Sequence, residues 1–145
     1  MKTSFDKGSA ARLSKAHPLL QKLMNTAREK AEFMILDSQR GRVAQELAFR
    51  QKRSKVHFGN SAHNWSPAIA LDVAPLPVDW KNTRAFEKLA RDVILPLAKE
   101  LGIPIRWGGD WNMDGKTSDE KFVDMPHYEL TPWRSYAAKS KPFEG

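Results

Sequence analysis

The chain contains no cysteine, which excludes disulfide bonds and thiolate metal ligands. A transition-metal site would have to be built from histidine, aspartate and glutamate. No apolar run approaches the roughly 18 residues that cross a bilayer, so we expect no transmembrane segment. The first residues, Met1–Asp6, lack the apolar core of a secretory signal. Repeats and low-complexity segments are also lacking, and we expect one domain over residues 1–145.

What the chain has is a substantial apolar content and an excess of positive charge. Of its 145 residues, 41% are hydrophobic and five are tryptophan, which is sufficient for a packed core. The net charge of +7 favours an anionic partner, such as nucleic acid, anionic lipid or an anionic cell-wall polymer. Charge alone favours nucleic acid. The basic residues are spread along the chain, however, so charge discriminates poorly among these partners.

Hydrophobic periodicity and turn residues predict alternating helices and short strands. Helices are expected over Ser9–Lys30, interrupted at His17-Pro18, over Arg42–Gln51, and over Thr83–Leu101, with a cap at Asn82 or Thr83, a kink at Pro96 and an end at Gly102. Strands are expected at Phe33–Leu36, Ala68–Val73, Ile103–Trp107 and His127–Leu130. Loops are expected at Lys52–Pro67 and Gly108–Val123. The order predicts an α+β fold, a single compact domain with helices packed on a small, mostly antiparallel sheet.

Two histidines and an aspartate are candidate metal ligands. Alternation along the predicted strand puts Asp72 on one face with Ala68 and Ala70, whose small side chains leave room beside it. A carboxylate in an apolar strand needs a cation or a metal. With His63 and His127 it could supply three zinc ligands, leaving a fourth position for water. Residue types alone favour a structural interpretation: a salt-bridged acid, a loop histidine and a core histidine.

Several local motifs together resemble one enzyme family. They are Arg40-x-x-x-x-Gln45, Ser61-x-His63, Ala70-x-Asp72, Gly108-Gly109-Asp110-Trp111 and Asp124-x-Pro126-His127-x-Glu129. In this order they resemble the zinc D-Ala-D-Ala carboxypeptidases and L-alanyl-D-glutamate endopeptidases that cut bacterial cell-wall peptides, most closely the phage endolysin branch. The sequence departs from the commonest family pattern, S-x-H-x-x-G-x-A-x-D, because the gap between His63 and Asp72 is longer and the glycine is replaced.

The resemblance implies one zinc ion per chain, bound by His63, Asp72 and His127. It implies that Asp124 is the catalytic base and that Arg40 binds the substrate carbonyl and its developing oxyanion. It also implies that Ser61 supports the site by hydrogen bonding near the substrate or a ligand.

Other residues keep alternative interpretations. Arg40 could be a surface residue opposite Asp37 or Glu46, with Arg42 as its competitor. Glu129 could orient a ligand or replace Asp124 as the base. Trp107 and Trp111 could line the peptide cleft or belong to the core. The segment Trp133–Lys139 could contact a wall or membrane surface, or pack as a terminal turn.

The resulting functional hypothesis is a zinc-dependent phage endolysin that cleaves the L-Ala–D-Glu bond of the peptidoglycan stem peptide and lyses the host. Alternatives are a D-Ala-D-Ala carboxypeptidase or dipeptidase of the same family, a catalytically inactive relative used as a binding module, and a basic nucleic-acid-binding protein. On the leading hypothesis nucleic acid is not a partner, and the positive charge attracts an anionic wall or membrane surface. We expect a monomer that accumulates in the host cytoplasm and reaches the periplasm or wall through a membrane lesion made by another protein.

Overall fold

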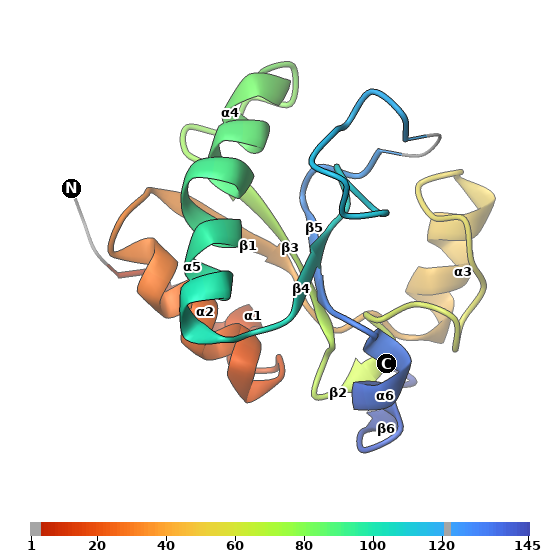
Figure 1. Ribbon diagram of the computed structural model, residues 1–145. Coiled ribbons are helices and arrows are strands. Elements are labelled where there is room, and N and C mark those ends of the chain that lie inside the picture. Colours follow the sequence, from red (N-terminus) through yellow and green to blue (C-terminus); the bar gives the residue numbers. More distant parts are fainter. Residues whose placement is uncertain (1–3, 121–122) are drawn as a thin grey trace.

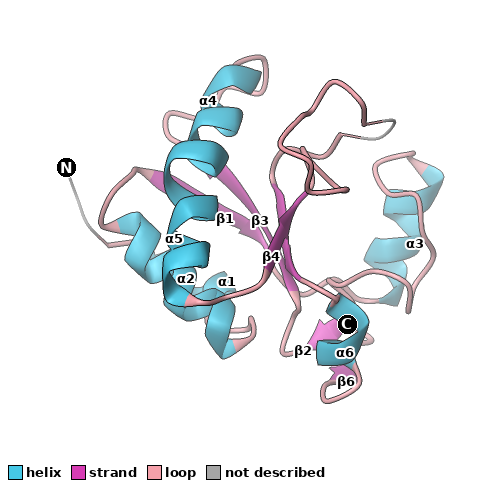
Figure 2. Cartoon of the chain, in the orientation of Figure 1, coloured by secondary structure: helices cyan, strands magenta, loops and turns pink. Residues whose placement is uncertain are grey.

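The computed structural model describes residues 4–120 and 123–145. In this part of the chain, a sheet of four strands lies at the centre, in the order β1 (Phe33–Asp37), β3 (Ala70–Pro75), β5 (His127–Leu130) and β4 (Ile105–Trp107) (Figure 1). Each neighbouring pair is antiparallel. Helices pack against the sheet (Figure 2). The predicted α+β fold with a small antiparallel sheet is therefore confirmed.

Two short helices form the N-terminal part, where the sequence predicts one interrupted helix. Helix α1 (Lys7–Leu13) begins before Ser9 because Asp6 is its cap and accepts a hydrogen bond from the Ser9 backbone N–H at 2.8 Å. Helix α2 (Pro18–Arg28) is capped by His17, whose Nδ1 accepts from the Leu19 N–H. Proline suits this first helical position, since its missing N–H would have no partner there anyway. The predicted interruption at His17-Pro18 is confirmed.

The third predicted helix is divided into α4 (Thr83–Lys88), a π-helical segment η1 (Leu89–Ile94) and α5 (Leu95–Leu101). Its ends are as predicted: the Asn82 side chain accepts from the Ala85 N–H, and Gly102 ends the helix with φ of 71°. The sequence did not predict the π-helical segment. Pro96 accounts for it, because proline has no N–H and its ring clashes with the carbonyl four residues earlier in a regular α-helix.

Strand β3 is shifted relative to its prediction. Ala68 is not part of it, because the Ala68 backbone bonds to the segment between α1 and α2, through Lys15 and His17. The strand instead extends to Pro75, which pairs with Phe33 of β1. Similarly, β4 begins at Ile105, since the Ile103 N–H closes the end of α5 by bonding to the Ala98 carbonyl. Strand β5 has the predicted bounds.

The two faces of the sheet differ in chemistry. One face packs against α1, α2, η1 and α5, and it carries the large buried side chains Ile35, Leu71, Val73, Ile105, Trp107, Tyr128 and Leu130. Burying each such side chain contributes about 1.5–3 kcal/mol. The other face carries Asp72, Arg106, His127 and Glu129, because successive side chains of a strand point to opposite faces. The polar face is where a site can form.

Smaller elements lie on the side of the polar face: α3 (Arg42–Arg50), α6 (Trp133–Ala137) and the pair β2 (Trp65–Ser66) and β6 (Lys141–Pro142) (Figure 1). The β2–β6 pair was not predicted and lies partly in the expected loop Lys52–Pro67. Trp133 and Tyr136 pack against the core, which agrees with the packed-turn interpretation of Trp133–Lys139. None of the helices in the described residues is long and apolar enough to cross a membrane.

Candidate active site

The register of the sheet brings two candidate ligands side by side. Asp72 of β3 lies directly opposite His127 of β5, and Glu129 of β5 lies between Ala70 and Arg106 of the two flanking strands. Directly opposite residues in an antiparallel pair have neighbouring side chains on the same face. The small side chain of Ala70 is fully buried beside this group. Strand pairing alone therefore brings Asp72, His127 and Glu129 together, and we call this part of the sheet the floor of the site.

His63 comes to the floor from the loop before β2, and three hydrogen bonds fix it. Its backbone carbonyl accepts from the Arg40 N–H at 2.8 Å, and its N–H donates to the Ser61 hydroxyl at 3.2 Å. Its ring Nδ1 lies 2.8 Å from the Ser38 carbonyl. Because a carbonyl can only accept, Nδ1 donates to it, and Nε2 is the ring nitrogen that faces the site. Ser61 thus supports a predicted ligand.

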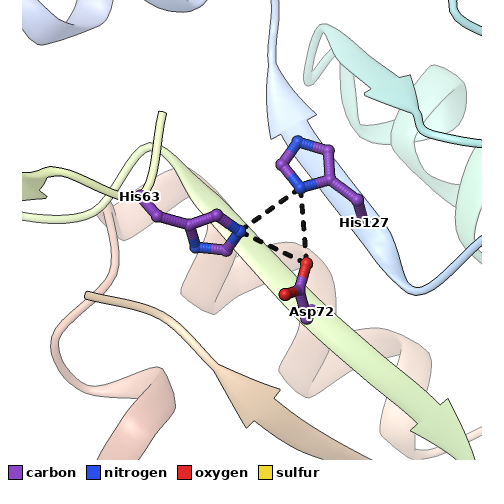
Figure 3. A group of neighbouring side chains, drawn as sticks. All are labelled: His63, Asp72 and His127. Carbon is purple, nitrogen blue, oxygen red and sulfur yellow. Dashed lines mark hydrogen bonds and ion pairs between the residues drawn. The ribbon is translucent and has the colours of Figure 1, made fainter. Parts of the chain in front are cut away.

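The three candidate ligand atoms form an equilateral triangle (Figure 3). His63 Nε2, Asp72 Oδ1 and His127 Nδ1 are 3.3 Å apart in every pair. A tetrahedral zinc ion bonded at about 2.0–2.1 Å keeps its ligand atoms about 3.3–3.4 Å apart. Among the described residues, this is the group of histidine and acidic side chains that could hold a metal ion. The donor set and its spacing fit zinc.

Electrostatics give the triangle an affinity for a cation. Burial alone raises the pKa of Asp72, but the charge of His63 and hydrogen bonds from both histidines outweigh burial and hold that pKa well below its ordinary value. Burial alone lowers the pKa of His127, whereas hydrogen bonds to Asp72 and Glu129 raise it to about 10. Without a metal, a proton therefore remains at His127. A metal cation can take the place of that proton.

Glu129 is committed to other side chains of the site. Its Oε1 lies 2.7 Å from His127 Nε2, and its Oε2 accepts from Arg106 Nη2 at 2.6 Å. Burial raises the pKa of Glu129, but the hydrogen bond with His127 and the Arg106 cation outweigh burial and lower it. This geometry favours the ligand-orienting interpretation of Glu129 over a role as the base.

Asp124, the predicted base, lines the cavity into which the triangle opens. Burial, followed by the nearby Asp72 carboxylate, raises the pKa of Asp124. Its N–H donates to the Gly108 carbonyl, and its carbonyl accepts from the His127 N–H. A Cβ atom on Gly108 would overlap the Asp124 carbonyl oxygen, so only glycine allows this close approach. The close approach to the Asp124 backbone thus explains why the motif has glycine at position 108.

Arg40 lies at the site and Arg42 does not. Arg40 Nη2 is 3.3 Å from Asp37 and 3.6 Å from Asp72, while Nη1 donates to the Gln45 amide oxygen at 3.2 Å. Arg42 instead pairs with Glu144 and lies over the Phe58 ring. The surface interpretation of Arg40 anticipated the contact with Asp37 but not the one with Asp72. Of the two arginines, Arg40 lines the cavity and Arg42 does not.

These groups open into a cavity of about 370 Å³. The candidate residues that line it are Arg40, Ser61, His63, Asp72, Trp111, Asp124, His127 and Glu129. Trp111 stacks obliquely on His127, with ring centroids 5.3 Å apart. Trp107 is not in the cavity: its ring is buried on the helix-covered face, and its Nε1 donates to the Met125 carbonyl. Of the two interpretations of Trp107, as a cleft residue or a core residue, its position agrees with the core one.

Sequence reasoning missed the role of a buried amide. The Asn64 side chain is completely buried, and its Oδ1 accepts from the backbone N–H groups of Gly59 and Ser61. Its Nδ2 donates to the Arg40 carbonyl and to Gln45 Oε1. Asn64 thus joins the loop that carries His63 to the segment that carries Arg40. Gln45 had a signal as the end of the Arg40 motif, and Asn64 as the first residue of the lengthened gap, but neither signal indicated a hydrogen bond between them.

Comparison with known proteins agrees with this arrangement. Residues 1–131 match the family described as phage L-alanyl-D-glutamate peptidase. The chain belongs to this family. A relative is the L-alanyl-D-glutamate peptidase of Escherichia phage T5, which is 33% identical over 144 residues, covering 90% of this chain and 99% of the relative. The crystal structure of the Serratia marcescens L-Ala D-Glu endopeptidase ChiX matches with a TM-score of 0.72 and 26% identity, over 92% of each chain. The peptidase hypothesis is confirmed at the level of the family.

Proposed function

We propose that this peptidase binds one zinc ion at His63, Asp72 and His127 and hydrolyses the L-Ala–D-Glu bond of the peptidoglycan stem peptide, so that the bacterial wall is lysed. The observation that carries the zinc assignment is the triangle of ligand atoms 3.3 Å apart at the floor of the cavity. The names of the relatives support the choice of bond over the D-Ala-D-Ala alternative. The same comparisons favour a peptidase over a nucleic-acid-binding protein.

The residues around the triangle suit the hydrolysis of an amide. Zinc, when bound, supplies Lewis-acid chemistry, polarising a carbonyl and making a nearby water more acidic. Asp124, with its raised pKa, accepts the proton of the attacking water and returns it to the leaving amine. Arg40 donates to the oxyanion that develops on the carbonyl, and loss of one such donor typically costs about 100- to 1000-fold in rate. Glu129 keeps His127 in the orientation that points Nδ1 at the triangle.

The walls of the cavity fit an anionic peptide. Besides Arg106, which is paired to Glu129, the cationic side chains that line it are Arg40, Arg53 and Lys55. In the L-Ala–D-Glu bond, the amino group of glutamate forms the scissile amide. Glutamate has two carboxyl groups and continues the chain through only one of them. The other carboxyl group can stay ionised, close to the scissile amide. Cationic side chains attract such a substrate and lower the cost of bringing it into the cavity. We propose that the basic lining serves this purpose.

Digestion of purified peptidoglycan followed by mass spectrometry tests this function. We expect fragments that end in L-Ala and fragments that begin with D-Glu, loss of activity with a chelator, and recovery with zinc. His127→Ala and Asp124→Ala should abolish the products. His57→Ala is the matched control, because His57 pairs with Glu46 and does not line the cavity. Release of free D-Ala without cleavage of the stem would refute the choice of bond, and full activity in both site variants would refute the mechanism.

The route to the wall is a separate proposal. We propose that the protein is made in the host cytoplasm as a monomer and passes through a membrane lesion that another protein makes. Expression alone should leave cells intact, and permeabilising the membrane should start lysis. Lysis without permeabilisation would contradict this route. Light scattering of the purified protein tests the monomer.

A further inference from the structure

Arg106 belongs to β4 and is not a candidate metal ligand, yet it is connected to the triangle through two neighbours. We propose that Arg106 is a positioning residue: through Glu129 and Trp111 it fixes the ring of His127 with Nδ1 toward Asp72 and His63. The inference rests on the proposed function, because it takes His127 as a metal ligand. It adds a residue that the sequence motifs did not single out.

The contacts form a closed circuit of four side chains, which we call the Arg106 circuit: Arg106, Glu129, His127 and Trp111. Arg106 donates from Nη2 and Nε to the same Glu129 oxygen, Oε2, at 2.6 and 3.2 Å. The other oxygen, Oε1, is 2.7 Å from His127 Nε2. The guanidinium of Arg106 lies 5.2 Å from the ring centroid of Trp111, and the Trp111 ring lies tilted by 39° against the His127 ring. Each member thus contacts the next, and the last contacts the first.

This arrangement determines which nitrogen of His127 faces the triangle. Glu129 Oε1 holds His127 Nε2 at 2.7 Å, so the ring can turn only its other nitrogen, Nδ1, toward Asp72 and His63. The tilted Trp111 ring lies beside the His127 ring and opposes its rotation. The β4–β5 register sets Arg106 opposite Glu129, and the β3–β5 register sets Asp72 opposite His127. Strand β5 therefore joins the circuit to the triangle.

Arginine has a specific advantage at this position. The Glu129 side chain is 5% exposed, and a buried carboxylate that loses its cation is strongly disfavoured in that place. Without Arg106, the carboxylate is better solvated when it turns away from His127. A lysine keeps the charge, but it cannot offer the two donors of a planar fork while also lying over an indole ring. We therefore expect Arg106→Lys to restore only part of what Arg106→Gln removes.

A second arginine provides a matched control. Arg91 donates from Nε to Glu87 at 2.9 Å, and its guanidinium lies 5.5 Å from the Trp107 ring centroid. Its side chain is 30% exposed, against 31% for Arg106. Arg91 therefore makes the same two kinds of contact at the same exposure, and it does not line the active-site cavity. Replacing it reports the general effect of losing such an arginine.

The test compares Arg106→Gln, Arg106→Lys and Arg91→Gln in the full chain. Three quantities are measured: the zinc dissociation constant by competition with a chromophoric chelator, the visible spectrum of the cobalt-substituted protein, and kcat and KM on soluble muropeptides. For Arg106→Gln we expect zinc affinity to fall by about 10- to 100-fold, the cobalt spectrum to change, and kcat to fall with little change in KM. In a Glu129→Gln background, Arg106→Gln should cost little more, because it acts through Glu129.

Each other outcome overturns the inference. Zinc affinity and a cobalt spectrum unchanged in Arg106→Gln would remove the positioning role. A raised KM with unchanged metal binding would assign Arg106 to substrate binding instead. An equal loss of zinc affinity in Arg91→Gln would show a general loss of stability. Failure of the unsubstituted protein to bind one zinc or cobalt ion per chain would refute the proposed function itself, and the inference with it.

Discussion

Lengthening one ligand by a single methylene should greatly weaken zinc binding. In Asp72→Glu the carboxylate moves outward by about 1.5 Å, the length of a carbon–carbon bond. Metal sites tolerate deviations of only about 0.2 Å in ligand distance. The backbone of β3 cannot retreat to compensate, because it is paired on both sides, with β1 and β5. The histidines cannot follow either, since the Ser38 carbonyl holds His63 and Glu129 holds His127.

We therefore expect Asp72→Glu to weaken zinc binding by more than the roughly 10- to 100-fold that loss of an outer partner costs. Chelator competition and the zinc content after dialysis measure this. Asp37→Glu is the control, because Asp37 lies opposite Asp72 in the β1–β3 register and also contacts Arg40, but is not a ligand. It should retain its zinc. A fully loaded Asp72→Glu variant with unchanged affinity would refute the assignment of this carboxylate to the metal.

Three further predictions concern the base, the proton and the buried amide. Asp124→Asn should lower kcat by about 100- to 10,000-fold while zinc is retained; muropeptide kinetics that stay unchanged would return the role of base to Glu129. Zinc affinity should rise about tenfold per pH unit between about pH 7 and 9, because zinc displaces a proton from His127, whose raised pKa of about 10 lies above this window; calorimetric titration at several pH values measures it, and a flat response would contradict the proton displacement. Asn64→Ala should lower the free energy of unfolding by about 1–3 kcal/mol for each buried partner left unsatisfied, which urea denaturation measures; unchanged stability would show that water replaces the amide.

Elements with strong local signals were predictable from the sequence. Strand β5 lies where the alternating segment His127–Leu130 predicts it. The helix from Thr83 to Leu101 has its predicted ends because Asn82 and Gly102 act locally. The order of the strands was not predictable in the same way. It depends on contacts between distant segments, as does the pairing of β2 with β6.

The position of Trp107 could have been derived from its own strand. Arg106 alternates with Ile105 and Trp107, so once the arginine is placed on the polar face, the tryptophan must lie on the apolar one. Trp111 has no such constraint, because it lies in a loop, and its contact with His127 emerges only from the folded chain. The role of Arg106 was hidden for a related reason. Its partner Glu129 lies 23 residues away along the chain, and only the β4–β5 register brings them together.

The longer gap between His63 and Asp72 is compatible with the site because independent elements position the two residues. The sheet places Asp72 through its pairing with His127. His63 is placed from behind, by the Ser38 carbonyl at its ring and the Arg40 N–H at its carbonyl. The contacts that position Asp72 and His63 are therefore made with residues outside the segment 64–71. Extra residues there can be accommodated in β2 and the turn that follows it, while Asn64 ties the start of the segment to Arg40. Contacts outside the gap, and not its length, therefore determine whether the triangle closes.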